Sequence, residues 1–146
     1  MLLRRLPLLA VLAVFSAGCS SDPYKSASVS GRVTLNGQPL ADAEVMFQPV
    51  ALEGSINPGP GSYGITDAEG RYTLKLIGKE TKGAVVGKHK VRIGHHEPPG
   101  DPFDDTPKKR PKRAIQIPAK YQQPEAALEF DVPAGGTTSA DFQLTS

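Results

Sequence analysis

The histidines and acidic residues between positions 95 and 105 are the group in this sequence whose chemistry best suits a metal ion. They are His95, His96, Glu97, Asp101, Asp104 and Asp105. Imidazole and carboxylate groups hold a divalent cation if the Pro-Pro-Gly turn between them folds the aspartates back. However, adjacent residues on a strand point to opposite faces, so His95 and His96 cannot both face one ion there. We therefore predict a polar strand end entering a solvated loop and no bound metal. The weak candidates for metal ligands are His95, His96, Asp101 and Asp104.

A basic run follows directly after these acidic residues. Its cations are Lys108, Lys109, Arg110, Lys112 and Arg113. Such a run can contact an anionic surface, either lipid headgroups or acidic polysaccharide. It can also be a solvated loop neutralised by the preceding aspartates, and this is the interpretation we favour. No aromatic residues that would stack on bases are interleaved with it, so we predict no nucleic-acid binding.

Catalytic motifs are absent from the sequence. No Gly-x-Ser-x-Gly nucleophile motif is present, and no recognisable motif pairs any of the three histidines with a nucleophile. Asp67 lies in the segment Thr-Asp-Ala-Glu-Gly, where an aspartate ordinarily bonds to turn amides. We therefore predict a protein that is not an enzyme and that needs no cofactor.

The single cysteine, Cys19, follows a leader with the layout of a secretory signal peptide. Residues 1–18 contain two arginines, a short apolar run and small residues before the cysteine. Ala17, Gly18 and Cys19 resemble the bacterial lipobox, which implies a diacylated cysteine at the new N-terminus. Ser16 stands where that motif usually has an aliphatic residue, so ordinary cleavage and a diffusible domain remain the alternative. Two or more acyl chains anchor a domain stably, which one chain does not.

These features divide the chain into three parts. We predict a lipoprotein signal peptide at 1–18, a lipidated cysteine with a flexible tether at 19–27, and one domain at 28–146. Without the two leader arginines, 15 Lys and Arg residues face 15 Asp and Glu residues. A neutral domain has no general attraction to nucleic acid. The predicted location is the bacterial cell envelope, with the choice of inner or outer membrane left open.

Alternating apolar and polar residues predict that the domain is all-β. About seven strands bring one apolar face each to a shared core, which is typical of a β-sandwich. Turn signals separate them, among them Asn36-Gly37, whose residues both tolerate positive φ. The segments with apolar alternation are 29–35, 43–48, 63–65, 72–76, 89–93, 128–132 and 140–144. A long loop at 94–125 is expected, and Ile115, Ile117 and Tyr121 suggest that its second half docks on the sandwich.

Two stretches of this domain resemble a known family. The first runs Val-Ser-Gly-Arg-Val-Thr-Leu-Asn-Gly from Val29, and the second runs Thr-Asp-Ala-Glu-Gly-Arg-Tyr-Thr-Leu from Thr66. They are similar to the opening strand and the hairpin of the carboxypeptidase regulatory-like (transthyretin-like, prealbumin-type) domain. The resemblance covers nearly all of residues 28–146 and extends to small surface lipoproteins of planctomycete-like bacteria. It implies a Greek-key β-sandwich that is usually a non-catalytic accessory module.

The same family contains 5-hydroxyisourate hydrolases, which end in Tyr-Arg-Gly-Ser. This chain ends in Gln-Leu-Thr-Ser, so no hydrolase residue carries over. The expected function is a membrane-anchored, non-enzymatic module of the cell envelope with a structural or binding role. Its partners would be the membrane, through lipid on Cys19, and an envelope protein or polysaccharide. The alternative is a small-ligand or metal carrier that uses the loop at 94–115.

Overall fold

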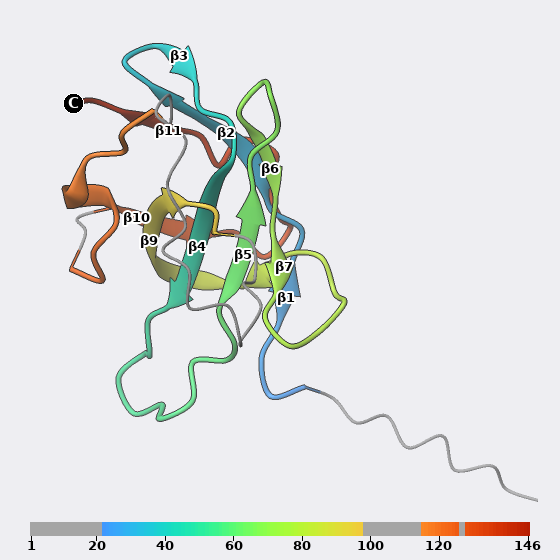
Figure 1. Cartoon of the computed structure of the whole chain (residues 1–146). Helices are drawn as coiled ribbons and strands as arrows, with labels where there is room; N and C mark the ends of the chain where they lie inside the picture. Colours follow the sequence, from blue (N-terminus) through green and yellow to red (C-terminus); the bar gives the residue numbers. More distant parts are fainter. Residues whose placement is uncertain (1–21, 98–114, 126–127) are drawn as a thin grey trace, which may run out of the picture.

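The computed structural model describes residues 22–97, 115–125 and 128–146, and these form two layers of β-sheet (Figure 1). Within the described residues there is no α-helix, and no helix is long and apolar enough to cross a membrane. The elements are β1 (Ser26–Ala27), β2 (Ser30–Leu35), β3 (Gln38–Pro39), β4 (Ala43–Pro49), β5 (Ser62–Ile65), β6 (Arg71–Thr73), β7 (Lys75–Leu76), β8 (Ala84–Val85), β9 (Gly87–His95), the 3-10 turn η1 (Ala119–Tyr121), β10 (Glu129–Val132) and β11 (Phe142–Leu144).

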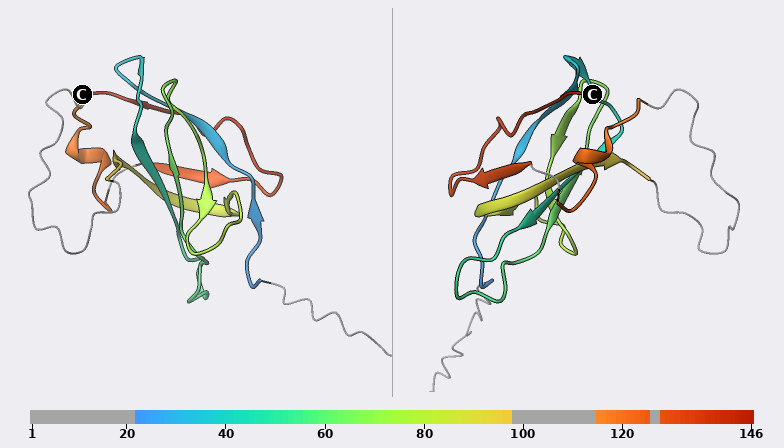
Figure 2. Two further views of the ribbon diagram at one scale, coloured as in Figure 1. Left: turned by 45° about the vertical axis from the view of Figure 1, so that its right-hand side comes forward. Right: turned by 90° about the vertical axis from the view of Figure 1, so that its left-hand side faces the viewer.

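The larger sheet has the order β10-β9-β4-β5-β7, and its strands are antiparallel. The smaller layer is built around β2, which pairs with β3, β6 and β11. Views from two further directions show the layers facing each other (Figure 2). The prediction of an all-β sandwich is confirmed. All seven predicted segments contain a strand, and the higher strand count comes from short pairings such as β1 with β8.

The core is formed by the residues that alternation placed on the inner faces. Val33, Val45, Leu74 and Ile93 are completely buried, while most of their outward neighbours along the strands are polar. Aromatic rings from three strands meet at its centre, and the Phe47 ring lies 5.7 Å from Phe130 and 6.0 Å from Phe142 between ring centroids. Burial of these apolar side chains is the main favourable contribution to folding.

The turns follow the predicted chemistry. Asn36 and Gly37 have φ of 50° and 81°, as the two-residue turn between β2 and β3 requires. The Asp67 carboxylate accepts hydrogen bonds from the amides of Glu69 and Arg71 at 3.0 and 2.8 Å. Asp67 is therefore the turn residue that the sequence predicted.

One predicted strand, 72–76, belongs to both layers. Its first half, β6, pairs with β2, and its second half, β7, pairs with β5. The buried residue between them, Leu74, lies where the chain passes from one layer to the other. This strand therefore ties the two sheets together at one edge.

The β-structure begins two residues before the predicted start of the domain at residue 28. Ser26 and Ala27, which the sequence assigned to a flexible tether, form β1 and pair with Val85 and Ala84 of β8. A strand of two residues is too short to show alternation in the sequence, so this strand is recognised only by its pairing with β8. The β-structure therefore begins at Ser26.

The second half of the long 94–125 segment docks on the sandwich, as predicted. Two of the three residues that indicated this, Ile117 and Tyr121, make the contacts. Ile117 is buried in the core, and the Tyr121 hydroxyl accepts a hydrogen bond from the backbone amide of Thr145 at 3.1 Å. The expectation for Ile115 is wrong, because half of its surface is exposed. Gln122 closes this segment by donating to the carbonyl of Ile117 at 2.6 Å.

Candidate functional site

The residues that the sequence singled out for metal chemistry are only partly described. His95 is the last residue of β9, and Nδ1 of His96 lies 3.6 Å from a carboxylate oxygen of Glu44 on β4. Asp101 and Asp104 fall outside the described residues. Within the part of the chain that the structure describes, no three His, Cys, Asp or Glu side chains are grouped as a metal site would need. The described residues therefore add no support to the alternative of a metal carrier.

The other predicted sites lie outside the described part of the chain. These are the lipidation residue Cys19 and the basic run of Lys108, Lys109, Arg110, Lys112 and Arg113. Their roles stay predictions. The structure instead draws attention to a surface that sequence reasoning missed.

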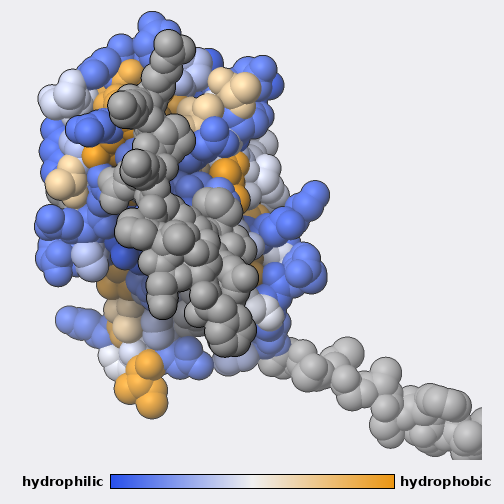
Figure 3. Space-filling model, in the orientation of Figure 1, coloured by the Kyte–Doolittle hydropathy of each residue, from blue (hydrophilic) through white to orange (hydrophobic). Residues whose placement is uncertain are grey.

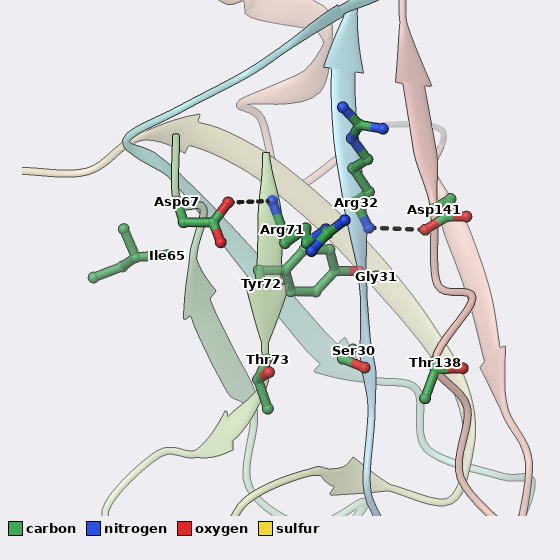
Figure 4. Close-up of a pocket in the computed structure, with 10 residues that line it drawn as sticks. All are labelled: Ser30, Gly31, Arg32, Ile65, Asp67, Arg71, Tyr72, Thr73, Thr138 and Asp141. Atoms are coloured by element: carbon green, nitrogen blue, oxygen red, sulfur yellow. Dashed lines mark hydrogen bonds between the residues drawn. The ribbon is translucent and has the colours of Figure 1, made fainter. Parts of the chain in front are cut away.

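This surface is a hollow of about 450 Å³ over the outer face of β2 and β6 (Figure 4). We call it the arginine hollow. It is lined by Ser30, Gly31, Arg32, Ile65, Asp67, Arg71, Tyr72, Thr73, Thr138 and Asp141. Two exposed arginines, two aspartates and the hydroxyls of Ser30, Thr73 and Thr138 supply its polar groups.

The antiparallel register of β2 and β6 positions the arginines. Arg32 is directly opposite Arg71, and Ser30 is directly opposite Thr73. Opposed residues of an antiparallel pair share one face, with Cβ atoms about 4.5–5.5 Å apart. Like charges in that position are destabilising. The register therefore places two arginines on neighbouring strands of one outer face, with the Arg32 side chain running along β2 (Figure 4).

The hollow holds two carboxylates, Asp67 and Asp141, beside its two arginines, and the hydrogen bonds show how these four side chains are engaged. Arg32 donates from Nε to the carbonyl of Glu69 at 2.8 Å, which holds its side chain over the turn between β5 and β6. The nearby carboxylates are engaged by backbone groups: Asp141 accepts from the Arg32 amide at 2.8 Å and Asp67 accepts from the Arg71 amide. Among the described residues, neither arginine side chain forms an ion pair with a carboxylate.

The floor of the hollow is rigid. Tyr72 is buried, and its hydroxyl donates to the carbonyl of Ala140 at 2.6 Å. Burial, together with the negative charge of Asp141, raises the pKa of Tyr72, so this hydroxyl stays protonated and keeps donating. A Cβ atom on Gly31 would lie 2.0 Å from the carbonyl oxygen of Ala140, so only glycine allows β2 to approach this segment.

This arrangement has the chemistry of anion binding. A guanidinium group presents several N–H donors in a planar fork that matches carboxylate, phosphate or sulfate oxygens. The hydroxyls of Ser30, Thr73 and Thr138 add donors and acceptors suited to a polyhydroxylated molecule. Strand alternation marks Arg32 and Arg71 as outward residues, but the pairing of β2 with β6, which makes them neighbours, has no local sequence signal.

Comparison of the chain with models of protein families, with curated proteins and with solved structures gives no match.

Proposed function

We propose that this chain is an exported lipoprotein whose β-sandwich binds an anionic ligand of the cell envelope and catalyses no reaction. The leader at 1–18 and the small residues before Cys19 support export and lipid attachment. The strand and turn motifs support the assignment to carboxypeptidase regulatory-like domains.

The observation that carries the binding role is the opposed pair Arg32 and Arg71 in the arginine hollow. Two arginines on neighbouring strands offer guanidinium donors that one extended anionic ligand can use together. Because the hollow is open to water, each contact with an anion is weak, and affinity would come from several contacts along a repeating ligand. An acidic polysaccharide offers carboxylates for the arginines and hydroxyls for Ser30 and Thr73.

Binding can be tested with oligogalacturonate, an acidic oligosaccharide, and with neutral dextran as the control ligand. We expect the wild-type chain to bind oligogalacturonate and not dextran, with affinity that falls as salt rises. Arg32→Gln with Arg71→Gln should weaken binding about tenfold or more, because two charge-assisted contacts are lost. The matched control is Lys88→Gln with Lys90→Gln, which removes two exposed cations from β9. Equal weakening by both pairs would contradict a site at the arginine hollow.

Lipid attachment has its own test. In a bacterial host, the wild-type chain should be recovered in the membrane fraction with a mass that begins at Cys19 and includes acyl chains. Cys19→Ala should remain unprocessed or be released. An unmodified soluble wild-type chain would show that Ser16 prevents lipobox processing, and the domain would then act as a diffusible protein.

A further inference from the structure

The end of the sandwich beside β1 carries apolar side chains that the core does not use. The loop 50–61 lies at this end (Figure 1). Leu52 and Ile56 in this loop are 74% and 103% exposed. Val50 and Ile77, near the base of the same loop, are also exposed large apolar residues. The space-filling view shows an apolar projection at the lower end of the molecule, where Figure 1 places this loop (Figure 3).

Three segments that are distant in sequence meet at this end. The Ile77 amide donates to the carbonyl of Gly61 at 2.9 Å, which joins the segment after β7 to the base of the loop. A Cβ atom on Gly59 would lie 3.1 Å from the ring of Tyr24, so the first described residues also pack there. Lys79 forms an ion pair with Asp22 at 2.8 Å and lies over the Tyr24 ring at 5.1 Å.

The chain length before Asp22 determines what faces this end. Only Ser20 and Ser21 separate Cys19 from Asp22. With consecutive Cα atoms 3.8 Å apart, Cys19 lies within about 11 Å of Asp22 whatever its conformation. If acyl chains on Cys19 are buried in a bilayer, Asp22 and the segments packed beside it are held close to the lipid headgroups.

We infer that the loop 50–61 inserts its apolar side chains into the same lipid surface that holds the anchor. Leu52 and Ile56 are the side chains that enter, and they gain a favourable environment because the bilayer boundary removes apolar surface from water. The contact fixes which end of the sandwich faces the membrane. The inference rests on the proposed lipid attachment at Cys19.

The test uses the mature lipoprotein and one reporter at a time. In the lipidated chain the thiol of Cys19 is blocked by its thioether bond, so Ile56→Cys or Gln38→Cys supplies a single thiol for a fluorescent label. Ile56 is fully exposed, and Gln38 is an exposed residue of β3 at the opposite end of the molecule (Figure 1). Neither substitution removes a core contact. Each labelled protein is bound to phosphatidylcholine vesicles that contain spin-labelled phosphatidylcholine.

We expect both proteins to float with the vesicles and the label at position 56 to be quenched at least about twofold more than the label at position 38. Flotation with equal quenching at the two positions would overturn the insertion and leave the lipid anchor intact. Failure of the unsubstituted chain to float would overturn the anchor and the inference together.

Discussion

The arginine hollow and the loop 50–61 are both exposed surfaces, yet they are built in opposite ways. The hollow lies on two hydrogen-bonded strands whose register fixes Arg32 opposite Arg71, over a floor closed by Tyr72. The loop presents Leu52 and Ile56 on backbone outside any strand. A surface with fixed spacing can recognise the geometry of a ligand, whereas an exposed apolar loop needs only a medium that accepts apolar groups. Substitutions should therefore affect the two regions very differently.

The largest effect should come from Gly31→Ala, which adds a methyl group under the arginine hollow. The new Cβ would lie 2.0 Å from a backbone oxygen of Ala140, so β2 and the segment before β11 must move apart. We expect a loss of about 2–4 kcal/mol in the free energy of unfolding, as for severe overpacking. Urea denaturation measures it. Gly135→Ala is the matched control, because nothing lies within 4 Å of its added Cβ, and it should be close to neutral.

Tyr72→Phe tests the same floor with a smaller change. The carbonyl of Ala140 loses the donor that lies 2.6 Å away, and a buried acceptor left without its partner costs about 1–3 kcal/mol. Thermal unfolding should show a lower Tm. Tyr63→Phe is the control, since that ring is partly exposed and should change stability by about 0.5 kcal/mol or less. Similar losses in both variants would mean that the hydroxyl bond to Ala140 is not what stiffens the floor.

Acid should weaken the sandwich through His89, which is buried on β9 of the larger sheet. Burial lowers the pKa of this histidine, and this effect outweighs the hydrogen bond to the Gly87 carbonyl and the charge of Asp131, which raise it. The unfolded chain then binds a proton more readily than the folded chain. The contribution of neutral His89 to the free energy of unfolding is therefore fully present above the ordinary histidine pKa of about 6.5, and it is lost as the pH drops below that value.

The His89 ring lies 5.5 Å from Phe47, which contacts Phe142 of β11, so a proton there disturbs the layer that carries β2. Within the described residues, Nε2 of His89 has no hydrogen-bond partner. His89→Leu should thus preserve stability at pH 8 and reduce the decline between pH 6.5 and pH 5, as followed by urea denaturation at each pH. An unchanged decline would assign the acid sensitivity to other groups.

Local patterns in the sequence predicted one part of the fold well. Alternation identified the inner faces of the strands, as at Leu74 and Ile93, because each side chain's face depends only on its neighbours along the chain. The turn at Asn36 and Gly37 was predictable for the same reason, since the positive φ depends on the residue type.

Pairings between distant segments were beyond such patterns. β11 lies parallel to β2, and β6 pairs with β2 while β7 pairs with β5. These registers depend on how the layers pack, and nothing at Arg32 indicates that Arg71 will stand opposite. The arginine hollow was missed for this reason, although alternation along each strand places both arginines on an outer face.

The smallest effect on stability should come from Leu52→Ser combined with Ile56→Ser in the loop 50–61. Both side chains are already largely in water, so their replacement removes little buried apolar surface and should change the free energy of unfolding by about 0.5 kcal/mol or less. Urea denaturation of the vesicle-free protein measures this. A loss above about 1 kcal/mol would mean that the loop packs on the sandwich and that the two regions are built alike. An unchanged stability means that these leucine and isoleucine side chains contribute nothing to the fold, as the proposed insertion into lipid expects, since both would then be free to leave the protein surface for the bilayer.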